Sequence, residues 1–351
     1  MTHDVIVVGG GIIGLSVAWR AAAAGLSVAV MDAHTGGGAS HAAAGMLAPV
    51  SEVTYTEEPL LRIGLASLDL WGEFAAELDD PATPLDFGTS GTLEVAASAD
   101  DLAVLDDLAR FQDKLGLPVE RLTGRECRRL EPMLAPGITG GLLCARDAWV
   151  DPRRVVTALR VRLRRLGVPL IEERAERVED IDAGAVVLAA GSWSGGLAAL
   201  PVRPVKGQIL RLRGPKGFLG RTVRGLVRGS HAYLVPRGDG ELVLGATQEE
   251  MGFDTTVTAG GVWELLRDAR EVVPGITELE LAETYAGLRP GTPDNLPLIG
   301  PVPGTRVIAA TGHGRNGVLL APFTAETVVR TLTGGEPGEL AAACDPGRFA
   351  P

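Results

Sequence analysis

The chain has 351 residues, which at roughly 150 residues per domain indicates about two domains and a sizeable core. Apolar residues make up 46% and charged residues 22%, which excludes a disordered chain, a collagen-like chain and a disulfide-stapled miniprotein. Acidic residues exceed basic ones by 44 to 33, so the net charge of −11 provides no general surface for nucleic acid or an anionic membrane.

Three cysteines, Cys127, Cys144 and Cys344, are far apart in the sequence, and the five histidines form no metal-binding motif. This pattern favours neither a disulfide framework nor a metal site. The apolar run over residues 5–19 follows Asp4 instead of a basic segment and is interrupted by glycines. It is also shorter than the ~18–20 residues of a spanning helix. We therefore expect no signal peptide and no membrane span, and predict a cytoplasmic protein.

The chain opens with a pattern typical of a βαβ unit. A continuous β-branched run predicts a strand buried on both faces, and an alanine-rich stretch after a glycine turn predicts a helix. Residues 33–50 are small, which predicts a loop whose backbone approaches another group closely. The elements are a strand at Val5–Val8, a turn over 9–14, a helix over Ile12–Ala24 that ends at Gly25, and a strand over Leu26–Met31.

Later segments alternate between helical and strand-rich patterns. We predict helices over 58–80 and 99–116, and another that begins after Asp151, with Pro152 at its first position and a body over 155–166. The strand patterns are a hairpin over 86–98, an apolar strand over 185–191, several alternating strands over 201–249 and an apolar strand over 306–310. The turn 311–317 leads into a helix from about 318 to 332, and the tail over 334–351 is expected to fray.

Three apolar strands that run into glycine turns are separated by antiparallel-looking segments. This interleaving predicts a discontinuous nucleotide-binding domain, with a β-rich second domain inserted in two pieces. We assign residues 1–84, 149–200 and 290–345 to the nucleotide-binding domain, 85–148 and 201–289 to the substrate-binding domain, and 346–351 to the tail.

Gly9, Gly11 and Gly14 form the pattern G-x-G-x-x-G between the first strand and the first helix. The first glycine makes the turn, the second lets backbone approach a pyrophosphate, and the third lets the helix pack on the strand. The helix N-terminus favours the anion. Asp32 ends the second strand 18 residues after Gly14, where a carboxylate accepts hydrogen bonds from ribose hydroxyls. The pattern predicts dinucleotide binding.

Two further segments favour FAD over NAD(P). Residues 36–47 supply small side chains and the hydroxyl of Ser40 just beyond the ribose acid, which suits a cofactor in extended form. The glycine turn 311–317 precedes the last helix, and a helix N-terminus aimed at the flavin would stabilise its anionic reduced ring.

An ordered set of motifs resembles the D-amino-acid oxidase superfamily of flavoproteins, and within it the glycine oxidase branch of the thiamine pathway. The motifs are VVGGGIIG, AAAGML, VVLAAGSWS, PVKGQ, AGLRPGTPD, IGP and ATGHGRNGVLLAP, and the resemblance covers about residues 4–333. It implies an α/β fold with an FAD-binding Rossmann-like domain of the glutathione-reductase type, beside a β-rich (α+β) substrate domain with a large antiparallel sheet. It also implies oxidation of an amino acid to an imine that hydrolyses, with O2 as electron acceptor and peroxide as product.

The resemblance assigns roles to residues around the substrate. Arg289 is implied to bind the substrate carboxylate, because a guanidinium can hold it bidentately. Tyr233 can donate a second hydrogen bond, and His231 shares its face of the strand. Arg315 resembles a residue near the substrate and the flavin edge, and Met46 resembles one that lines the small pocket above the flavin ring.

Gln248 departs from the family pattern, which has methionine there, and this leaves the shape of the pocket wall open. No residue is identified as a general base, and the resemblance requires none, because a neutral amine held by its carboxylate can release hydride directly. Residues 283–294 contain no cysteine, so the resemblance implies non-covalent FAD. The implied cofactor contacts are Gly9, Gly11, Ile12, Ile13, Gly14, Asp32, Ser40, His41, Ala44, Gly45, Met46, Ala175, Val178, Ala190, Gly191, Trp193, Gly312, His313, Gly314, Arg315, Asn316, Gly317 and Val318.

The leading interpretation is FAD-dependent oxidation of glycine, and of small amines such as sarcosine or D-alanine, to the imine or glyoxylate, ammonia and hydrogen peroxide, serving thiazole synthesis for thiamine. A D-amino-acid or sarcosine-type oxidase or dehydrogenase stays open because of Gln248. An NAD(P)-dependent dehydrogenase is disfavoured by the missing His/Lys constellation, and a non-catalytic flavin-binding protein would leave Arg289 and Tyr233 without a role. The expected partners are a small amino acid and O2, without nucleic acid, and a homo-oligomer is left open.

Overall fold

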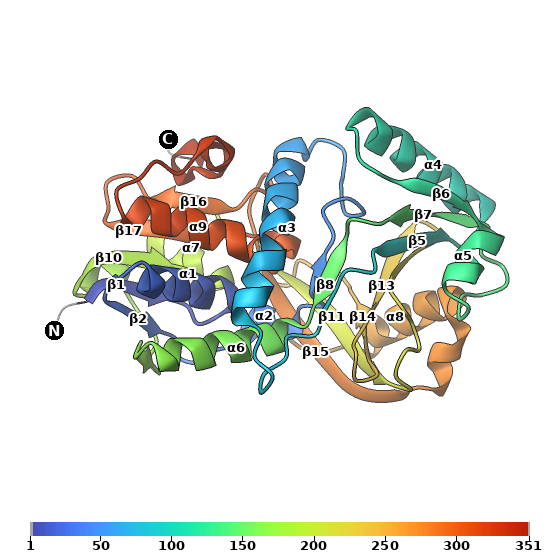
Figure 1. The fold of residues 1–351 in the computed structure, drawn as a ribbon, viewed down its shortest axis with the longest axis horizontal. Coiled ribbons are helices and arrows are strands. Elements are labelled where there is room, and N and C mark those ends of the chain that lie inside the picture. The colour runs from blue at the N-terminus through green and yellow to red at the C-terminus, as the bar shows by residue number, and fades with distance from the viewer. Residues whose placement is uncertain (1–2, 350–351) are drawn as a thin grey trace.

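A mostly parallel sheet forms one half of the computed structural model, which describes residues 3–349 (Figure 1). Its strand order is β16-β17-β10-β1-β2-β9, and only the edge strand β16 runs antiparallel to its neighbour. The predicted apolar runs form β1, β10 and β17, which lie next to one another, so their glycine turns meet at the same edge of the sheet. The bounds are β1 His3–Val8, β2 Val28–Met31, β9 Leu170–Ile171, β10 Ala183–Leu188, β16 Leu298–Pro301 and β17 Val307–Thr311.

Helices cover both faces of this sheet. On one face, α1, α3, α6 and α9 share an apolar core in which Trp19, Trp71 and Phe74 are almost fully buried. The predicted cap of α6 is confirmed, because the Asp151 side chain accepts a hydrogen bond from the Arg153 N–H. The helices are α1 Ile12–Ala23, α2 Gly38–Ala42, α3 Glu58–Leu78, α6 Pro152–Arg165, α7 Ser194–Ala198 and α9 Ala321–Leu332.

An eight-stranded sheet forms the other half of the molecule, at the right of Figure 1. Its order is β15-β11-β14-β13-β12-β5-β7-β6, antiparallel except for the parallel pair β5–β12. Alternate residues such as Leu210 and Leu244 pack against α8, whereas Ile209 and Tyr233 lie on the opposite face. The bounds are β5 Thr92–Ala96, β6 Glu120–Thr123, β7 Gly140–Cys144, β11 Arg203–Arg213, β12 Thr222–Val227, β13 Ser230–Pro236, β14 Glu241–Gly245, β15 Glu280–Gly291, α4 Ala99–Lys114, α5 Gly124–Leu130 and α8 Ala259–Val272.

A short three-stranded sheet, in the order β3-β8-β4, joins chain segments that also lead into the two larger sheets. The α/β class with a second, mostly antiparallel sheet is therefore confirmed. The exact domain boundaries stay a prediction. The three strands are β3 Met46–Leu47, β4 Phe87–Gly88 and β8 Ala148–Val150.

Two local predictions are wrong. The expected hairpin over 86–98 does not form, because β4 pairs with β8 while β5 pairs with β7 and β12. Partners distant in the sequence therefore replace the local pairing. The tail is not frayed over 334–349, because Ala341 and Cys344 are buried in the core of the first half and Arg348 binds the Asp294 carboxylate at 2.8 and 3.1 Å. Residues 350–351 lie outside the described residues.

No helix within residues 3–349 is long and apolar enough to cross a membrane.

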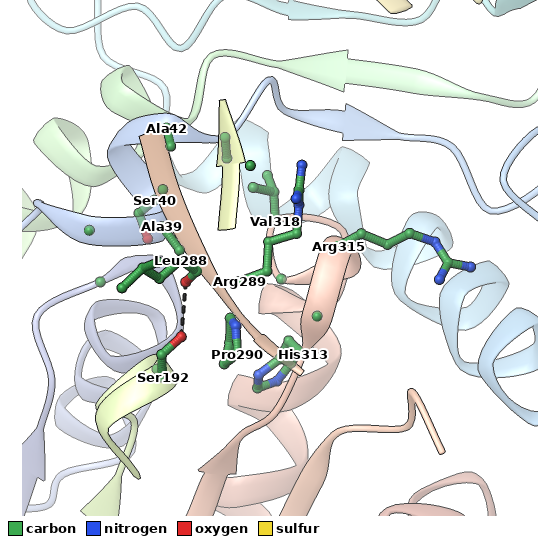
Figure 2. Close-up of a pocket in the computed structure, with 18 of the residues that line it drawn as sticks. Ala39, Ser40, Ala42, Ser192, Leu288, Arg289, Pro290, His313, Arg315 and Val318 are labelled. Carbon is green, nitrogen blue, oxygen red and sulfur yellow. Dashed lines mark hydrogen bonds between the residues drawn. The ribbon is translucent and has the colours of Figure 1, made fainter. Parts of the chain in front are cut away.

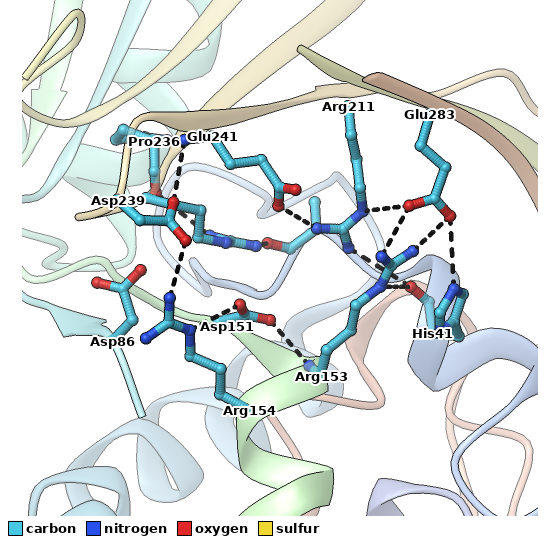
Figure 3. A network of polar contacts seen from close by, with 12 residues as sticks. His41, Asp86, Asp151, Arg153, Arg154, Arg211, Pro236, Asp239, Glu241 and Glu283 are labelled. Carbon is cyan, nitrogen blue, oxygen red and sulfur yellow. Dashed lines mark hydrogen bonds and ion pairs between the residues drawn. The ribbon is translucent and has the colours of Figure 1, made fainter. Parts of the chain in front are cut away.

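A polar network joins the two halves behind the small-residue loop after α2 (Figure 3). Arg153 from α6 donates two hydrogen bonds of 2.8 Å to the Glu283 carboxylate on β15, and a third of 3.0 Å to the His41 carbonyl. The hydrogen bonds from Arg153 lower the pKa of Glu283 to about 2, and Arg211 and His41 act in the same direction. The pair therefore connects one helix of the first half to the edge strand of the second.

Two more arginines of the network come from the large sheet. Arg211 on β11 is 2% exposed, pairs with Glu241 and donates to the His41 carbonyl. Arg237 is also buried and donates to the Ala44 carbonyl. The carbonyls of His41 in α2 and of Ala44 in the loop that follows are thus held by guanidinium groups from other elements, which sets the position of α2 and of this loop.

We expect Glu283→Gln to lower the free energy of unfolding at pH 7. The folded-state pKa of Glu283 is depressed, so its stabilisation is present above the unfolded value near 4.5 and is lost as the pH falls toward about 2. The difference between the native chain and the variant should therefore shrink between pH 4.5 and 2 in denaturant titrations. Glu172→Gln is the control, because Glu172 makes no ion pair with any residue of 3–349. A difference that stays constant over this range would contradict the role of the pair.

Candidate active site

A cavity of about 1590 Å³ is lined by residues from both halves of the molecule. Its walls include the glycine turn after β1, the loop after α2, the end of β17 and one face of the large sheet. Pockets for single small ligands are typically about 300–1,000 Å³. This cavity is therefore large enough for a dinucleotide together with a small substrate.

The glycine turn after β1 is shaped by close backbone contacts. A Cβ atom on Gly9, whose φ is +117°, would lie 2.2 Å from the Ala189 carbonyl oxygen. A Cβ on Gly14 would lie 1.9 Å from the Gly9 carbonyl oxygen, so Gly14 allows α1 to sit directly on the turn. Gly9 and Gly11 line the cavity, whereas Gly14 does not. Its contribution is packing, as the motif predicts.

Asp32 and Ser40 are fixed by backbone hydrogen bonds at the same end of the cavity. The two Asp32 carboxylate oxygens accept hydrogen bonds of 2.6 Å from the N–H groups of Gly10 and His34. Each oxygen keeps further acceptor capacity, which a ribose hydroxyl can use. The Ser40 hydroxyl accepts a hydrogen bond of 3.0 Å from the Ile12 N–H and so caps α1, whose N-cap residue is a glycine. These donors and acceptors fit a dinucleotide.

Arg289 and Tyr233 meet above two glycines of the large sheet. Arg289 lies on β15 and Tyr233 on β13, and the strands β11 and β14 run between them. A Cβ on Gly207 of β11 would lie 2.3 Å from Arg289 Nη1, and a Cβ on Gly245 of β14 would lie 2.5 Å from the Tyr233 hydroxyl oxygen. The two side chains therefore occupy the space that side chains at these glycines would fill.

The charge of the guanidinium and the protonation of the phenol suit a carboxylate ligand. Arg289 Nη1 donates to the Thr247 carbonyl at 3.1 Å, and no carboxylate in the described part of the chain pairs with Arg289. Burial raises the pKa of the Tyr233 phenol against the opposing charge of Arg289, so the phenol stays a hydrogen-bond donor at neutral pH. A carboxylate can thus receive hydrogen bonds from both groups.

Arg315 does not join Arg289, although the resemblance implied that it lies near the substrate. Figure 2 shows the two side chains pointing in different directions. Arg315 lines the cavity, but its Nη2 binds the Glu57 carboxylate and donates to the Glu52 carbonyl at 3.3 Å. Asn295 also donates to Glu57, at 2.7 Å. The nearby carboxylate therefore neutralises Arg315 and holds it at the cavity wall.

The other predicted substrate residues all line the cavity. Met46 lies on β3, and the His231 side chain on β13 is 55% exposed. Gln248 is exposed and lies between the main cavity and a smaller one of about 540 Å³. Its neighbour Thr247 lines both cavities as well. The wall at this point is therefore thin and polar.

Most predicted cofactor residues line the cavity, and five do not. His41 belongs to the polar network, and Val178 is buried in an apolar core of the first half. His313 is among the residues that do line the cavity. Burial lowers the pKa of its ring to about 3, so the ring is neutral, and its Nε2 lies 2.9 Å from the Thr324 hydroxyl. The five that do not line the cavity are Gly14, His41, Val178, Gly312 and Asn316.

One wall of the cavity is charged, and no sequence motif marked its residues. Glu94 on β5, Arg224 on β12 and Glu52 in the loop before α3 line the cavity next to His231 and Tyr233. A single charge within each of the buried segments TLEVA and TVRGLV was the available signal. On a strand with period two, such a residue faces away from its apolar neighbours and toward another surface.

Known proteins resemble this chain in sequence and in fold. The chain matches the FAD dependent oxidoreductase family over residues 4–331. It belongs to that family. It is 36% identical to the glycine oxidase of Geobacillus kaustophilus, over 92% of both chains, and a crystal structure of glycine oxidase from that organism superposes with a TM-score of 0.92, at 32% identity and over 99% of both chains. The family match makes this protein an FAD-dependent oxidoreductase.

A second kind of relative is longer. The chain is 33% identical to the bifunctional protein ThiO/ThiG of Trichormus variabilis, over 93% of this chain but only 52% of that protein. The chain thus spans about half the length of this relative.

We expect Gly207→Ala to weaken carboxylate binding by about 1.5–3 kcal/mol, the range for hydrogen bonds to charged groups, because the new methyl would displace the Arg289 guanidinium. The dissociation constant of propionate, followed by perturbation of the bound flavin's absorbance, measures the effect. Gly260→Ala on α8, where a Cβ meets nothing within 4 Å, is the control and should change nothing. Unaltered propionate affinity in Gly207→Ala would contradict the role of this glycine.

Proposed function

We propose that the protein oxidises glycine, with sarcosine and D-alanine as further substrates. Glycine, O2 and water would yield glyoxylate, ammonia and hydrogen peroxide by way of an imine, and the imine would serve thiazole synthesis for thiamine. The observation that carries the proposal is that the side chains of Arg289 and Tyr233 converge above two glycines of the large sheet. They line the same cavity as the glycine turn after β1. The glycine oxidase of Geobacillus kaustophilus supports the substrate by its name. The putative thiamine biosynthesis oxidoreductase ThiO of Rhizobium etli, which is 33% identical over 93% of this chain, supports the thiamine context.

The cofactor would be held, without a covalent bond, along the turn at Gly9 and Gly11, with Asp32 at the ribose and the loop over 42–46 beside the flavin. FAD, when bound, supplies the acceptor for the hydride that leaves the substrate's α-carbon, and this hydride carries both electrons of the oxidation. The guanidinium network holds the carbonyls of His41 and Ala44 and so positions this loop.

The protein's own contribution is to bind and orient the substrate. Arg289 would hold the carboxylate bidentately, and the Tyr233 phenol would donate to the same group, which leaves the α-carbon and the amine as the free end of glycine. The hydride step needs no base to take a proton. Holding the substrate in one orientation can therefore supply much of the reduction in the activation barrier. Burial lowers the pKa of His313 to about 3, so this ring is a poor base, and its Nε2 is already within hydrogen-bond distance of the Thr324 hydroxyl.

The direct test is the addition of glycine to the purified flavoprotein. We expect bleaching of the flavin absorbance without air, and stoichiometric hydrogen peroxide and glyoxylate with air. Flavin that is released by acid supports non-covalent binding, and flavin that stays with the precipitated protein contradicts it. If glycine, sarcosine and D-alanine all fail to bleach the flavin, the proposed substrate class is wrong.

Arg289→Ala should weaken the apparent affinity for glycine by about 3–5 kcal/mol, because the substrate carboxylate would be buried without its partner. Arg289→Lys should also be badly impaired, since a lysine keeps the charge but not the planar fork. The flavin spectrum should survive both changes, which steady-state kinetics and absorbance can show together. Arg315→Ala is the comparison, because its charge is already matched by Glu57. A larger loss in Arg315→Ala than in Arg289→Ala would mean that the anchor is Arg315.

A further inference from the structure

The chain that follows β14 continues alongside β11, and its backbone pairing changes beside the substrate anchor. Lys206 and Glu249 lie opposite each other and exchange both backbone hydrogen bonds, at 2.9 and 3.0 Å. In an antiparallel ladder the next pair to exchange both bonds is two residues further along each segment, which is Gln208 with Thr247. The Thr247 N–H does donate to the Gln208 carbonyl, at 3.3 Å. The return bond runs differently.

The hydroxyl of Thr247 takes the place of its own carbonyl in this pair. The Gln208 N–H donates to the Thr247 hydroxyl oxygen at 2.8 Å. The Thr247 carbonyl accepts instead from Arg289 Nη1, at 3.1 Å. Threonine side chains can offer the backbone such an alternative to a sheet hydrogen bond. The exchange of one acceptor for the other frees the carbonyl to hold the guanidinium.

Glu249 fixes the direction of the Thr247 hydroxyl. Its Oε1 accepts from this hydroxyl and, at 2.9 Å, from Gln208 Nε2, while Lys206 Nζ lies 3.5 Å from its Oε2. Burial works against the charge of Glu249, but the hydrogen bonds from Thr247 and Gln208 and the charge of Lys206 keep its pKa below the ordinary value. An ionised carboxylate can only accept. The hydroxyl therefore donates to Glu249 and turns a lone pair toward the Gln208 N–H.

The Thr247 carbonyl is the nearer of two carbonyls that accept from Arg289 Nη1. The other is that of Lys206, at 3.5 Å, which also accepts the Glu249 N–H at 3.0 Å. Nη1 is also the guanidinium atom closest to the space above Gly207. A guanidinium is planar and carries five N–H donors. Holding one of them on a fixed carbonyl sets the plane in which the others meet a carboxylate.

We propose that Thr247 is a positioning residue for the carboxylate anchor, because its hydroxyl binds the Gln208 N–H so that its carbonyl can hold Arg289. This inference rests on the proposed function, since it takes Arg289 as the anchor. Without the hydroxyl, the Gln208 N–H would turn to the carbonyl of residue 247 and compete with Arg289 for it. The guanidinium would then lose its fixed direction and keep its charge.

Substitutions at Thr247 separate the hydroxyl from the rest of the side chain. Thr247→Val and Thr247→Ala remove it, and Thr247→Ser keeps it. We expect the dissociation constant of propionate, measured from the absorbance of the bound flavin, to rise about three- to tenfold without the hydroxyl, the effect of one hydrogen bond, and by less than about twofold in Thr247→Ser. KM for glycine should rise in parallel and kcat should fall less, since a weaker carboxylate contact affects bound substrate and transition state alike.

Thr258→Val is the matched control. The Thr258 hydroxyl also binds Gln208, by accepting from Nε2 at 3.1 Å, and it caps α8 by accepting from the Gly261 N–H at 3.1 Å. Neither bond involves Arg289. Loss of this hydroxyl should lower the temperature of thermal unfolding and leave the propionate dissociation constant unchanged. The flavin spectrum verifies that every variant is loaded with FAD.

The outcomes separate this inference from the proposed function. Unchanged propionate affinity in both Thr247→Val and Thr247→Ala overturns the inference, and so does an equal loss in Thr247→Ser or in Thr258→Val, which would indicate general damage to the sheet. Arg289→Ala, measured beside them, tests the anchor. If it leaves propionate affinity unchanged, the anchor itself has failed. If it weakens propionate while the Thr247 variants do not, the anchor stands and the positioning role of Thr247 is wrong.

Discussion

The site depends on the absence of side chains at two positions, on the second and third strands from one edge of the large sheet. Arg289 and Tyr233 start from strands that are separated by β11 and β14, and they can meet only if the two intervening strands leave room on that face. Gly207 and Gly245 leave that room, since any Cβ there would lie within 2.5 Å of the guanidinium or the phenol. Glycine weakens a strand interior, so this sheet gives up packing to let two polar groups converge.

The same sheet also positions the cofactor end of the cavity. Arg211 and Arg237 extend from it to carbonyls of α2 and of the loop after α2. Arg153 reaches α2 from α6 while binding Glu283 on β15 (Figure 3). Replacing a buried ion pair by apolar groups is often neutral or stabilising, so such pairs are weak evidence of stability. Their contribution here is geometric, because directional bonds to fixed carbonyls place the loop relative to the large sheet.

Sequence patterns predicted the elements whose burial is uniform or strictly periodic. Continuous apolar runs became β1, β10 and β17 in one parallel sheet, and the motif around Arg289 predicted a residue that does lie in the cavity with Tyr233. Partners distant in the sequence decided the rest. The 86–98 segment pairs with strands more than 40 residues away, and Arg315 is captured by Glu57, a carboxylate that no motif marked. Glu94 and Arg224 become neighbours only through the parallel pairing of β5 with β12.

Three arginines that line the cavity differ in how their charge is matched by nearby acids. Arg315 is matched by Glu57, and Arg224 is surrounded by Glu52 and Glu94, whereas Arg289 has no acidic partner within residues 3–349. Of these three arginines, Arg289 is therefore the one that can attract a carboxylate, whereas the oxygens of Glu52 and Glu94 disfavour one along the charged wall. We propose that this order of charges favours a ligand that enters with its anionic group toward Arg289. Charge order would then add to size in the discrimination between substrates.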